Sequence, residues 1–380
     1  MIIGFDANRL FHDHGAMGSY GRCLMQGLAD ACPDHRYILY TPHARLIAPD
    51  DPILTSGRYK VVSPSGLFRD HFWRGLWLGH HLKQDAVQIY HGLGQTIPIS
   101  TKVRGISTLV TVHSLWFLHG RRRRLGFGPW FRHRKTAYAC RHADHIVAVS
   151  QAVRDGLMQH YAVADAKVSV VYPAAREAFY RPMPQAEARR LLAERWPDLP
   201  PLFVLNVGTA ASHTDWDVLM GAWALLPEVS RPTLVVAGYG PAERRAIEAF
   251  VAQHRLGAQV RLLGYVADDT LLQALYTAAA AFVYPSRYDG FALPIVEASL
   301  QGCPVVCYTT SSLPEAAGPS AGYVETQTPD ALAQAIDRIL TDDGVHDRIA
   351  REGRQYALDT FHPATLAHRM LSLYYRLHEP

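Results

Sequence analysis

The chain has 380 residues, 48% of them hydrophobic, with five cysteines and a formal net charge of +4. This length and apolar content predict two packed domains, and no apolar stretch reaches the roughly 20 residues that span a membrane. The cysteines are scattered and odd in number, which argues against a disulfide framework and against a zinc site. A soluble cytoplasmic protein is therefore expected.

Short apolar runs rich in β-branched residues alternate with helical patterns along the chain. The predicted strands of the first half are 1–7, 37–41, 59–63, 87–91, 107–113, 145–150 and 167–173. Those of the second half are 202–208, 233–238, 259–264, 280–286 and 304–309. Continuously hydrophobic strands separated by helices are typical of parallel sheets that are covered on both faces. The predicted fold class is therefore α/β, with two Rossmann-like, doubly wound parallel-sheet domains facing a cleft.

The stretch "YPAAREAFYRPMPQ", residues 172–185, interrupts this alternation. It is rich in proline and lacks apolar periodicity, so it is predicted to link the two domains. The first domain is expected to span 1–175, and the linker and second domain 176–361. The last segment, 362–380, has a helical pattern with no strand after it, and we expect it to pack back on the first domain.

Charge is unevenly distributed between the two halves. Residues 1–190 carry 25 Lys and Arg against 13 Asp and Glu, a balance of +12, whereas the remainder carries 13 against 21, a balance of −8. The last lysine is Lys167. A basic first half favours an anionic partner for that half.

The most informative motif is "YPSRYDGFALPIVEASLQGCPVV", residues 284–306. A buried strand ends before "RYDGF", and a helix with Pro294 near its first turn begins after it. Free backbone N–H groups at such a helix N-terminus attract anions. Asp289 and Glu297 are eight positions apart, which is about 12 Å along a helix. That distance is on the scale of a nucleotide sugar.

This motif resembles the pair of acids separated by seven residues in retaining glycosyltransferases of the GT-B fold, glycosyltransferase family four. The resemblance covers most of the chain and is strongest from 203 to 306. "LNVGTAASHTDWDVLMGAW" and "LVVAGYGP" are similar to the family's second domain, and "FDANRLFHDHGAMGSYGRCL" and "TLVTVHSLWF" to its first. The resemblance implies transfer of a sugar from a nucleoside diphosphate sugar to a saccharide or lipid-linked acceptor, with retention of configuration. The "FDANRL" segment near the start of the chain suggests mannose as the sugar. The first domain would bind the acceptor and the second the donor.

The resemblance also implies roles for individual residues. The expected catalytic residues are His113 and Asp289, at the donor sugar, and Glu297, at the ribose. The expected donor-binding residues are Gly15, Gly18, Gly208, Thr209, His213, Tyr265, Val266, Arg287, Gly290, Phe291 and Leu293. No metal or other cofactor is expected if backbone amides and arginine hold the diphosphate. Asp215 and Asp217 imitate the metal-binding pair of another glycosyltransferase class, but Asp215 is predicted to cap a helix instead.

One departure from the family pattern concerns the leaving diphosphate. Where the family usually has Arg and then Lys, this chain has His213 and Thr214. Arg287 and His213 are the candidate replacements, and a missing cation could cost about 3 kcal/mol of transition-state stabilisation, by analogy with an oxyanion-hole donor. The alternative hypothesis is therefore a catalytically silent sugar-nucleotide-binding or partner subunit.

The basic and aromatic tract "GRRRRLGFGPWFRHRK", residues 120–135, has several interpretations. Its arginines and aromatic residues, represented by Arg121, Arg122, Arg123, Arg124 and Trp130, suit a lipid-diphosphate acceptor or an anionic membrane on the inner face of the cell. A solvated basic loop is the alternative, and nucleic acid is not expected because no nucleic-acid-binding fold surrounds the tract. Bacterial polysaccharide or lipopolysaccharide synthesis is the expected setting.

Overall fold

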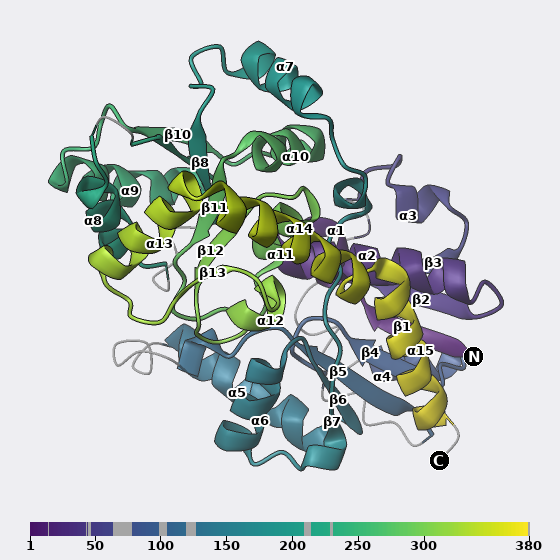
Figure 1. The fold of residues 1–380 in the computed structure, drawn as a ribbon. Coiled ribbons are helices and arrows are strands. Elements are labelled where there is room, and N and C mark those ends of the chain that lie inside the picture. Colours follow the sequence, from purple (N-terminus) through teal and green to yellow (C-terminus); the bar gives the residue numbers. More distant parts are fainter. Residues whose placement is uncertain are drawn as a thin grey trace. The chain divides into compact units, whose positions relative to one another are not determined.

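The computed structural model describes residues 1–13, 15–42, 44, 47–63, 78–98, 105–118, 127–208, 214–228 and 231–378. The chain divides into two compact units, of which unit 1 is Met1–Ala174 with Pro363–Pro380 and unit 2 is Ala175–His362. The boundaries predicted from the sequence were 175 and 362. Each unit contains its own parallel sheet with helices packed against it (Figure 1).

Unit 1 contains a seven-stranded sheet in the order β3-β2-β1-β4-β5-β6-β7 within the described residues. Its strands are β1 (Ile2–Asp6), β2 (Arg36–Tyr40), β3 (Tyr59–Val62), β4 (Ile89–Gly92), β5 (Ser107–Val112), β6 (His145–Ala148) and β7 (Val168–Val170). Its helices are α1 (Asn8–His12), α2 (Ala16–Ala31), α3 (Pro52–Thr55), α4 (Leu78–Gln84), α5 (Phe127–His142), α6 (Gln151–Tyr161) and α15 (Pro363–His378).

The strand order of unit 1 reverses at β1, which pairs in parallel with β2 on one side and with β4 on the other. The central strands β1, β4 and β5 are mostly apolar and almost entirely buried, because helices cover both sides of the sheet. In such sheets ligands bind beyond the carboxyl ends of the strands, beside the point where the order reverses. The segments that follow β1, β4 and β5 are therefore placed to form a site.

The C-terminal helix α15 belongs to unit 1, where it packs on α2. Leu366, Met370 and Tyr374 follow a helical spacing and are buried in the core of this unit. The two helices approach closely at Gly27, where an added Cβ would lie 2.9 Å from the Cβ of Ala367. Glycine at this position therefore allows the last helix to reach the first domain.

Unit 2 contains a six-stranded parallel sheet in the order β10-β9-β8-β11-β12-β13 within the described residues. Its strands are β8 (Phe203–Val207), β9 (Thr233–Ala237), β10 (Val260–Gly264), β11 (Ala281–Tyr284), β12 (Val305–Tyr308) and β13 (Gly322–Val324). Its helices are α7 (Gln185–Arg195), α8 (Trp216–Leu225), α9 (Pro241–Gln253), α10 (Asp269–Ala278), α11 (Leu293–Leu300), α12 (Leu313–Ala317), α13 (Pro329–Thr341) and α14 (Asp343–Thr360).

The strand β13 was not predicted from the sequence; it is only three residues long and begins with glycine. Its place in the sheet depends on packing, since a Cβ at Gly322 would lie 2.8 Å from Cδ1 of Ile339 on α13. The equally short β7 lies in the apolar run 167–173, which made it predictable, whereas no such run surrounds β13. Among the helices that the structure describes, none is both long and apolar enough to cross a membrane.

Candidate functional site

The turn between β11 and α11 lies at the carboxyl edge of the sheet of unit 2, beside the point where β8 pairs with both β9 and β11. Its backbone is held by neighbouring segments. The Asp215 N–H donates to Pro285 O at 2.9 Å, and Thr310 Oγ1 donates to Ser286 O at 3.3 Å. The predicted anion-binding turn is therefore a fixed structure at the ligand-binding edge of its sheet.

Asp289 is oriented by several hydroxyl groups. Its carboxylate Oδ2 accepts a hydrogen bond of 2.7 Å from the Tyr284 hydroxyl, while its carbonyl oxygen accepts from Ser311 at 2.5 Å and from Ser312 at 3.0 Å. Burial, together with the Asp289 charge, raises the pKa of Tyr284 well above its ordinary value, so the phenol stays a donor. Asp289 itself is partly exposed.

The residues after Asp289 lead into the first turn of α11. Gly290, Phe291 and Leu293 are all buried. The Leu293 N–H donates to Phe291 O at 3.1 Å, whereas the Gly290 N–H forms no hydrogen bond with another described residue. An amide at this place can donate to an anion near the helix N-terminus.

Glu297, the second acid of the motif, is buried inside unit 2. One carboxylate oxygen accepts from Arg176 Nη2 at 3.2 Å, and the other accepts from the Tyr276 hydroxyl at 3.2 Å. Arg176 also forms an ion pair with Asp269 of α10. Burial raises the pKa of Glu297, and the charge of Arg176 opposes this shift. Both carboxylate oxygens of Glu297 therefore accept hydrogen bonds from other residues of unit 2. These contacts were not predicted from the sequence, which suggested a contact with the ribose.

Arg287, the expected replacement cation, binds Asp215. Its Nε donates to Asp215 Oδ2 at 2.6 Å and its Nη2 to Oδ1 at 2.9 Å, the paired geometry that arginine forms with carboxylates. Asp215 is the N-cap residue of α8, at the predicted position, but its side chain makes no capping hydrogen bond and binds Arg287 instead. The Arg287 side chain is still 56% exposed, although its charge is balanced by a buried carboxylate.

Two of the predicted glycine amides already have partners. The Gly208 N–H donates to Ala237 O at 3.0 Å, and the Gly15 N–H donates to Asp13 Oδ1 at 2.7 Å. Gly18 has a steric role instead, because a Cβ there would lie 1.6 Å from Asp13 O. The start of α2 therefore requires glycine for close packing, and Gly208 supports the strand end rather than offering its amide to a ligand.

In unit 1 a buried hydrogen-bond network begins at the C-terminal helix. His91 on β4 binds the Tyr374 hydroxyl through Nδ1 at 2.7 Å and Thr111 Oγ1 through Nε2 at 2.7 Å. Thr111 in turn shares a hydrogen bond of 3.3 Å with the Tyr20 hydroxyl of α2. Burial lowers the pKa of His91 to about 3, so this imidazole is neutral near pH 7.

His113 follows the end of β5 and is in contact with this network. Its ring meets that of Tyr20 edge to face, with centroids 4.9 Å apart, and its Nε2 lies 2.8 Å from Leu93 O. If the imidazole is neutral, Nε2 carries the proton that this carbonyl accepts. Burial lowers the pKa of His113 to about 4, which favours that neutral form. Its Nδ1 is then the nitrogen that can accept a hydrogen bond from a ligand.

The remaining predicted residues are dispersed. Tyr265, 58% exposed, and Val266 follow β10. Trp130 is 50% exposed on α5, with Arg134 placed 5.0 Å from its ring centroid. Six predicted residues lie outside the described part of the chain: Thr209, His213, Arg121, Arg122, Arg123 and Arg124.

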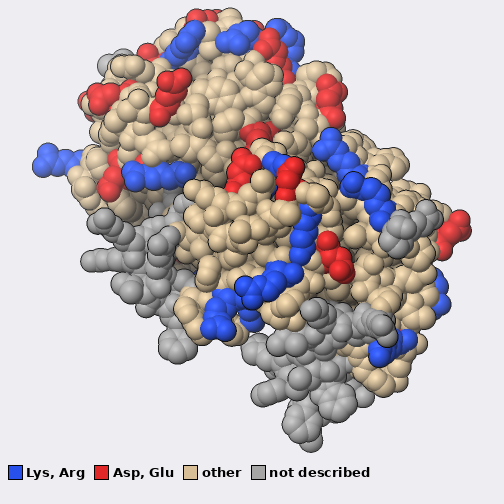
Figure 2. Space-filling view, turned by 90° about the horizontal axis from the view of Figure 1, so that it is seen from below, with Lys and Arg blue, Asp and Glu red and all other residues tan. Residues whose placement is uncertain are grey.

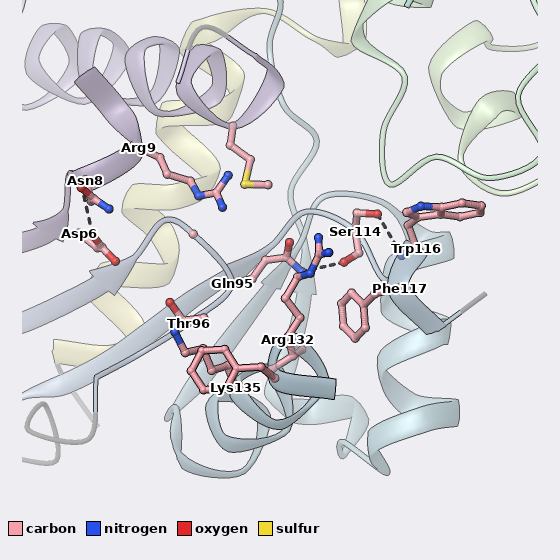
Figure 3. Close-up of a pocket in the computed structure, with 14 residues that line it drawn as sticks. Asp6, Asn8, Arg9, Gln95, Thr96, Ser114, Trp116, Phe117, Arg132 and Lys135 are labelled. Atoms are coloured by element: carbon pink, nitrogen blue, oxygen red, sulfur yellow. Dashed lines mark hydrogen bonds between the residues drawn. The ribbon is translucent and has the colours of Figure 1, made fainter. Parts of the chain in front are cut away.

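A cavity of about 390 Å³ opens in unit 1 where β1, β4 and β5 end (Figure 3). Asp6, Arg9 and Gln95 line it from the segments after β1 and β4, and Phe117 and Arg132 line it from the segment after β5 and from α5. Its volume falls in the range of small-molecule pockets. Arg132 belongs to the tract 120–135 that the sequence suggested for an acceptor or a membrane, whereas Asp6, Arg9, Gln95 and Phe117 were not predicted. The rule that ligands bind beyond strand ends could have indicated Arg9 and Gln95.

Within the described ranges, no three His, Cys, Asp or Glu side chains lie close enough together to hold a metal ion. The family model for glycosyl transferases group 1 matches residues 194–356, and that for glycosyltransferase family 4 matches residues 18–178. One match lies mainly in each unit, and together they extend over most of the chain.

The chain is 38% identical over 143 residues to O-antigen chain mannosyltransferase B of Escherichia coli, covering 37% of each protein. It is 25% identical over 282 residues to the serotype-specific mannosyltransferase WbdA of Escherichia coli, covering 72% of this chain but 34% of that protein. The chain thus spans about a third of the length of these curated relatives.

The sucrose-phosphate synthase structure from Thermosynechococcus elongatus superimposes with a TM-score of 0.80 at 22% identity, covering 99% of both chains. At this identity the likeness concerns the fold. The two parallel-sheet domains are each matched mainly by one of the two family models. This agrees with the resemblance noted in the sequence. The chain belongs to the glycosyltransferases of family four and has their GT-B fold.

Proposed function

We propose that this protein transfers a sugar, with mannose as the leading candidate, from a nucleoside diphosphate sugar to a saccharide or lipid-linked acceptor with retention of configuration. The observation that carries the proposal is the fixed turn before α11. It combines the oriented carboxylate of Asp289 with the amide of Gly290 at a helix N-terminus. The two mannosyltransferase relatives support the choice of mannose and of bacterial surface polysaccharide synthesis as the setting.

In the proposed reaction, the diphosphate lies against the N-terminus of α11, where amide donors and the helix dipole favour negative charge. Departure of the nucleoside diphosphate increases the charge on its phosphate oxygens, so donors fixed beforehand stabilise the transition state more than the ground state. Asp289 would stabilise the positive charge that develops on the sugar ring. The neutral His113 would offer Nδ1 to a hydroxyl group of the donor sugar.

Arg287 and Glu297 would contribute indirectly. The ion pair of Arg287 with Asp215 holds the turn itself against the start of α8. Glu297 holds the Arg176 segment against α11, which steadies the helix whose N-terminus receives the diphosphate. We infer that no metal is required, because the turn has its own donors for phosphate oxygens. Transfer in excess EDTA should stay within about twofold of the untreated rate, and its loss, with recovery on adding magnesium, would contradict this.

Thermal unfolding in the presence of nucleotide sugars tests the donor proposal. Mannose and glucose linked to GDP, UDP and ADP would be added one at a time to the full chain. A donor at 100 times its Kd stabilises the folded state by about 2.7 kcal/mol, which raises the Tm by several degrees. If none of them raises the Tm of the folded protein, the proposal fails. For an active donor, the anomeric configuration of the product, measured by NMR, tests retention.

A second candidate function is a catalytically silent sugar-nucleotide-binding or partner subunit. The pairing of Arg287 with Asp215 favours it, because the arginine expected to replace the family's basic pair already has a counter-charge. This candidate predicts a rise in Tm with a nucleotide sugar but no transfer. A transfer rate above the rate of donor hydrolysis would eliminate it.

A further inference from the structure

The cavity at the strand ends of unit 1 has more positive than negative charge. Three cations, Arg9, Arg132 and Lys135, and one carboxylate, Asp6, are among its described lining residues. Arg132 and Lys135 are three positions apart on α5 and therefore share a face of that helix, while Arg9 comes from α1. Figure 3 shows Arg9 and Arg132 extending toward the same space from opposite walls. The charge balance of the lining is +2.

The carboxylate in this lining is recessed, whereas the cations are accessible. Asp6 is 6% exposed and accepts from the Asn8 N–H at 3.3 Å. Arg132 is exposed, and no carboxylate of the described residues forms an ion pair with it. Arg9 lies 3.2 Å from Asp13, in a pair exposed enough to contribute little to stability. A ligand entering the cavity would therefore meet cationic groups.

Gln95 gives the cavity a hydrogen-bond acceptor of fixed orientation. Its backbone has a positive φ of 62°, and its N–H donates to Thr111 O at 3.0 Å. Its side-chain Nε2 donates to Ser114 O at 2.7 Å, which leaves Oε1 as the atom that can accept from a hydroxyl group. A strained backbone held in this way is a recurrent feature of ligand sites. Phe117 adds an apolar surface of the kind that sugar rings contact.

We infer that this cavity binds the acceptor through a phosphate group attached to a sugar. The inference rests on the proposed function, because it assigns the chemical class of the acceptor. A phosphate monoester carries a charge of about −1.5 to −2 near pH 7, which is opposite in sign to the net charge of the lining. Arginine forms paired hydrogen bonds with phosphate oxygens, and Arg9 and Arg132 approach from two sides. A neutral saccharide would cover these cations without compensating their charge.

The basic residues of α5 lie both inside and outside the cavity. On the face of the molecule drawn in Figure 2, Lys and Arg side chains form short runs, with Asp and Glu side chains between them. On α5 itself, Arg134 lies over the exposed Trp130, and neither residue lines the cavity. This helix therefore contains a matched pair for a test, with Arg132 in the cavity and Arg134 outside it.

The test measures binding to the full chain by isothermal titration calorimetry, with mannose 1-phosphate, methyl α-mannoside and inorganic phosphate as probes. Mannose 1-phosphate should bind at least tenfold more tightly than methyl α-mannoside. Arg132→Gln and Lys135→Gln should each weaken its binding by about five- to tenfold. Arg134→Gln, with the same change in net charge, should alter it by less than twofold.

Two results would overturn the inference. One is equal affinity for mannose 1-phosphate and methyl α-mannoside. The other is an effect of Arg134→Gln as large as that of Arg132→Gln, since this would show attraction to the whole helix rather than to the cavity. Circular dichroism and the Tm of each variant show whether the fold is intact, and the two single cavity variants serve as independent checks on each other.

The phosphate could belong to a soluble sugar phosphate or to a diphosphate that joins the sugar to a lipid. A mannosyl diphosphate with a short prenyl chain distinguishes these sources. Binding tighter than that of mannose 1-phosphate assigns the lipid source, and equal binding assigns the soluble one. Phosphatidylglycerol vesicles without sugar form a further arm. If Arg132→Gln abolishes vesicle binding while leaving mannose 1-phosphate binding unchanged, the helix meets a membrane and the inference is wrong.

This experiment can fail independently of the proposed function. If mannose 1-phosphate binds through Arg132 but no nucleotide sugar raises the Tm, the donor proposal fails and the phosphate site stands. If a nucleotide sugar binds and the protein transfers its sugar equally well to phosphorylated and neutral acceptors, only the phosphate inference fails.

Discussion

The charged groups of unit 2 and those of the unit 1 cavity are held in different ways. Around the turn before α11, the carboxylates of Asp289 and Glu297 and the guanidinium of Arg287 all bind other groups of unit 2. In the cavity of unit 1, Arg132 and Lys135 are exposed on one helix face, and Lys135 Nζ lies 4.2 Å from the ring centroid of Phe131. Fixed charges suit a transition state of defined geometry, because they need no reorganisation during the reaction. Long exposed side chains keep rotamer freedom and can adjust to a bound group.

The largest effect is expected for Asp289→Asn. Asparagine keeps the size of the side chain and can still accept from Tyr284, but it removes the charge that we propose stabilises the developing cation. Transfer should fall by about 100-fold, comparable with the loss of one preorganised group. The Tm should change by less than about 2 °C, because the side chain is partly exposed. A variant with near-normal kcat would show that the fixed charge in unit 2 does not act in the reaction.

The next effect concerns stability. Glu297→Gln removes the charge opposite Arg176 in a buried pair, and the free energy of unfolding should fall by about 2 kcal/mol, measured by urea denaturation. Glu177→Gln is the control, because Glu177 forms an exposed pair with Arg181 at 3.7 Å. Its effect should stay within about 0.5 kcal/mol. Equal losses in both variants would mean that burial does not distinguish the two pairs.

A smaller loss is expected in unit 1 when the buried network is interrupted. Tyr374→Phe deletes the hydroxyl that binds His91 and should lower the free energy of unfolding by about 1 kcal/mol. The neighbouring Tyr375 is 42% exposed, so Tyr375→Phe should have less than half that effect. If Tyr375→Phe lowers the free energy of unfolding more than Tyr374→Phe does, the buried network does not stabilise unit 1 in the way that the structure indicates.

The smallest effect is a dependence on pH. Burial lowers the pKa of His91 to about 3, whereas an unfolded histidine titrates near 6.5, so the unfolded state binds a proton that the folded state does not. Stability from this residue is therefore complete above about pH 6.5 and decreases as the pH falls. Between pH 7 and pH 6 the loss should be about 0.7 kcal/mol. His91→Gln should lose less stability over this interval. An unchanged pH dependence in this variant would show that a group other than His91 takes up the proton on unfolding.

Much of the fold follows from local patterns. Each predicted strand corresponds to a strand of the structure, because a buried parallel strand must be continuously apolar whatever its partners are. The position of Asp289 could also be predicted from the sequence, since the order strand, turn and helix places the turn at the ligand-binding edge. The strand β13 was missed, because its three residues acquire their conformation from the packing of Gly322.

The sequence by itself determined the two parallel-sheet domains, the place of the Asp289 turn and the excess of positive charge in the first half. Only the tertiary structure decided which charges are bound and which are accessible. Arg287 meets Asp215 at a separation of 72 residues, and His91 meets Tyr374 at 283. The physical reason is that local propensity depends on neighbours in sequence, whereas the partner of a charged group depends on which strand ends and helices the packed sheet brings together.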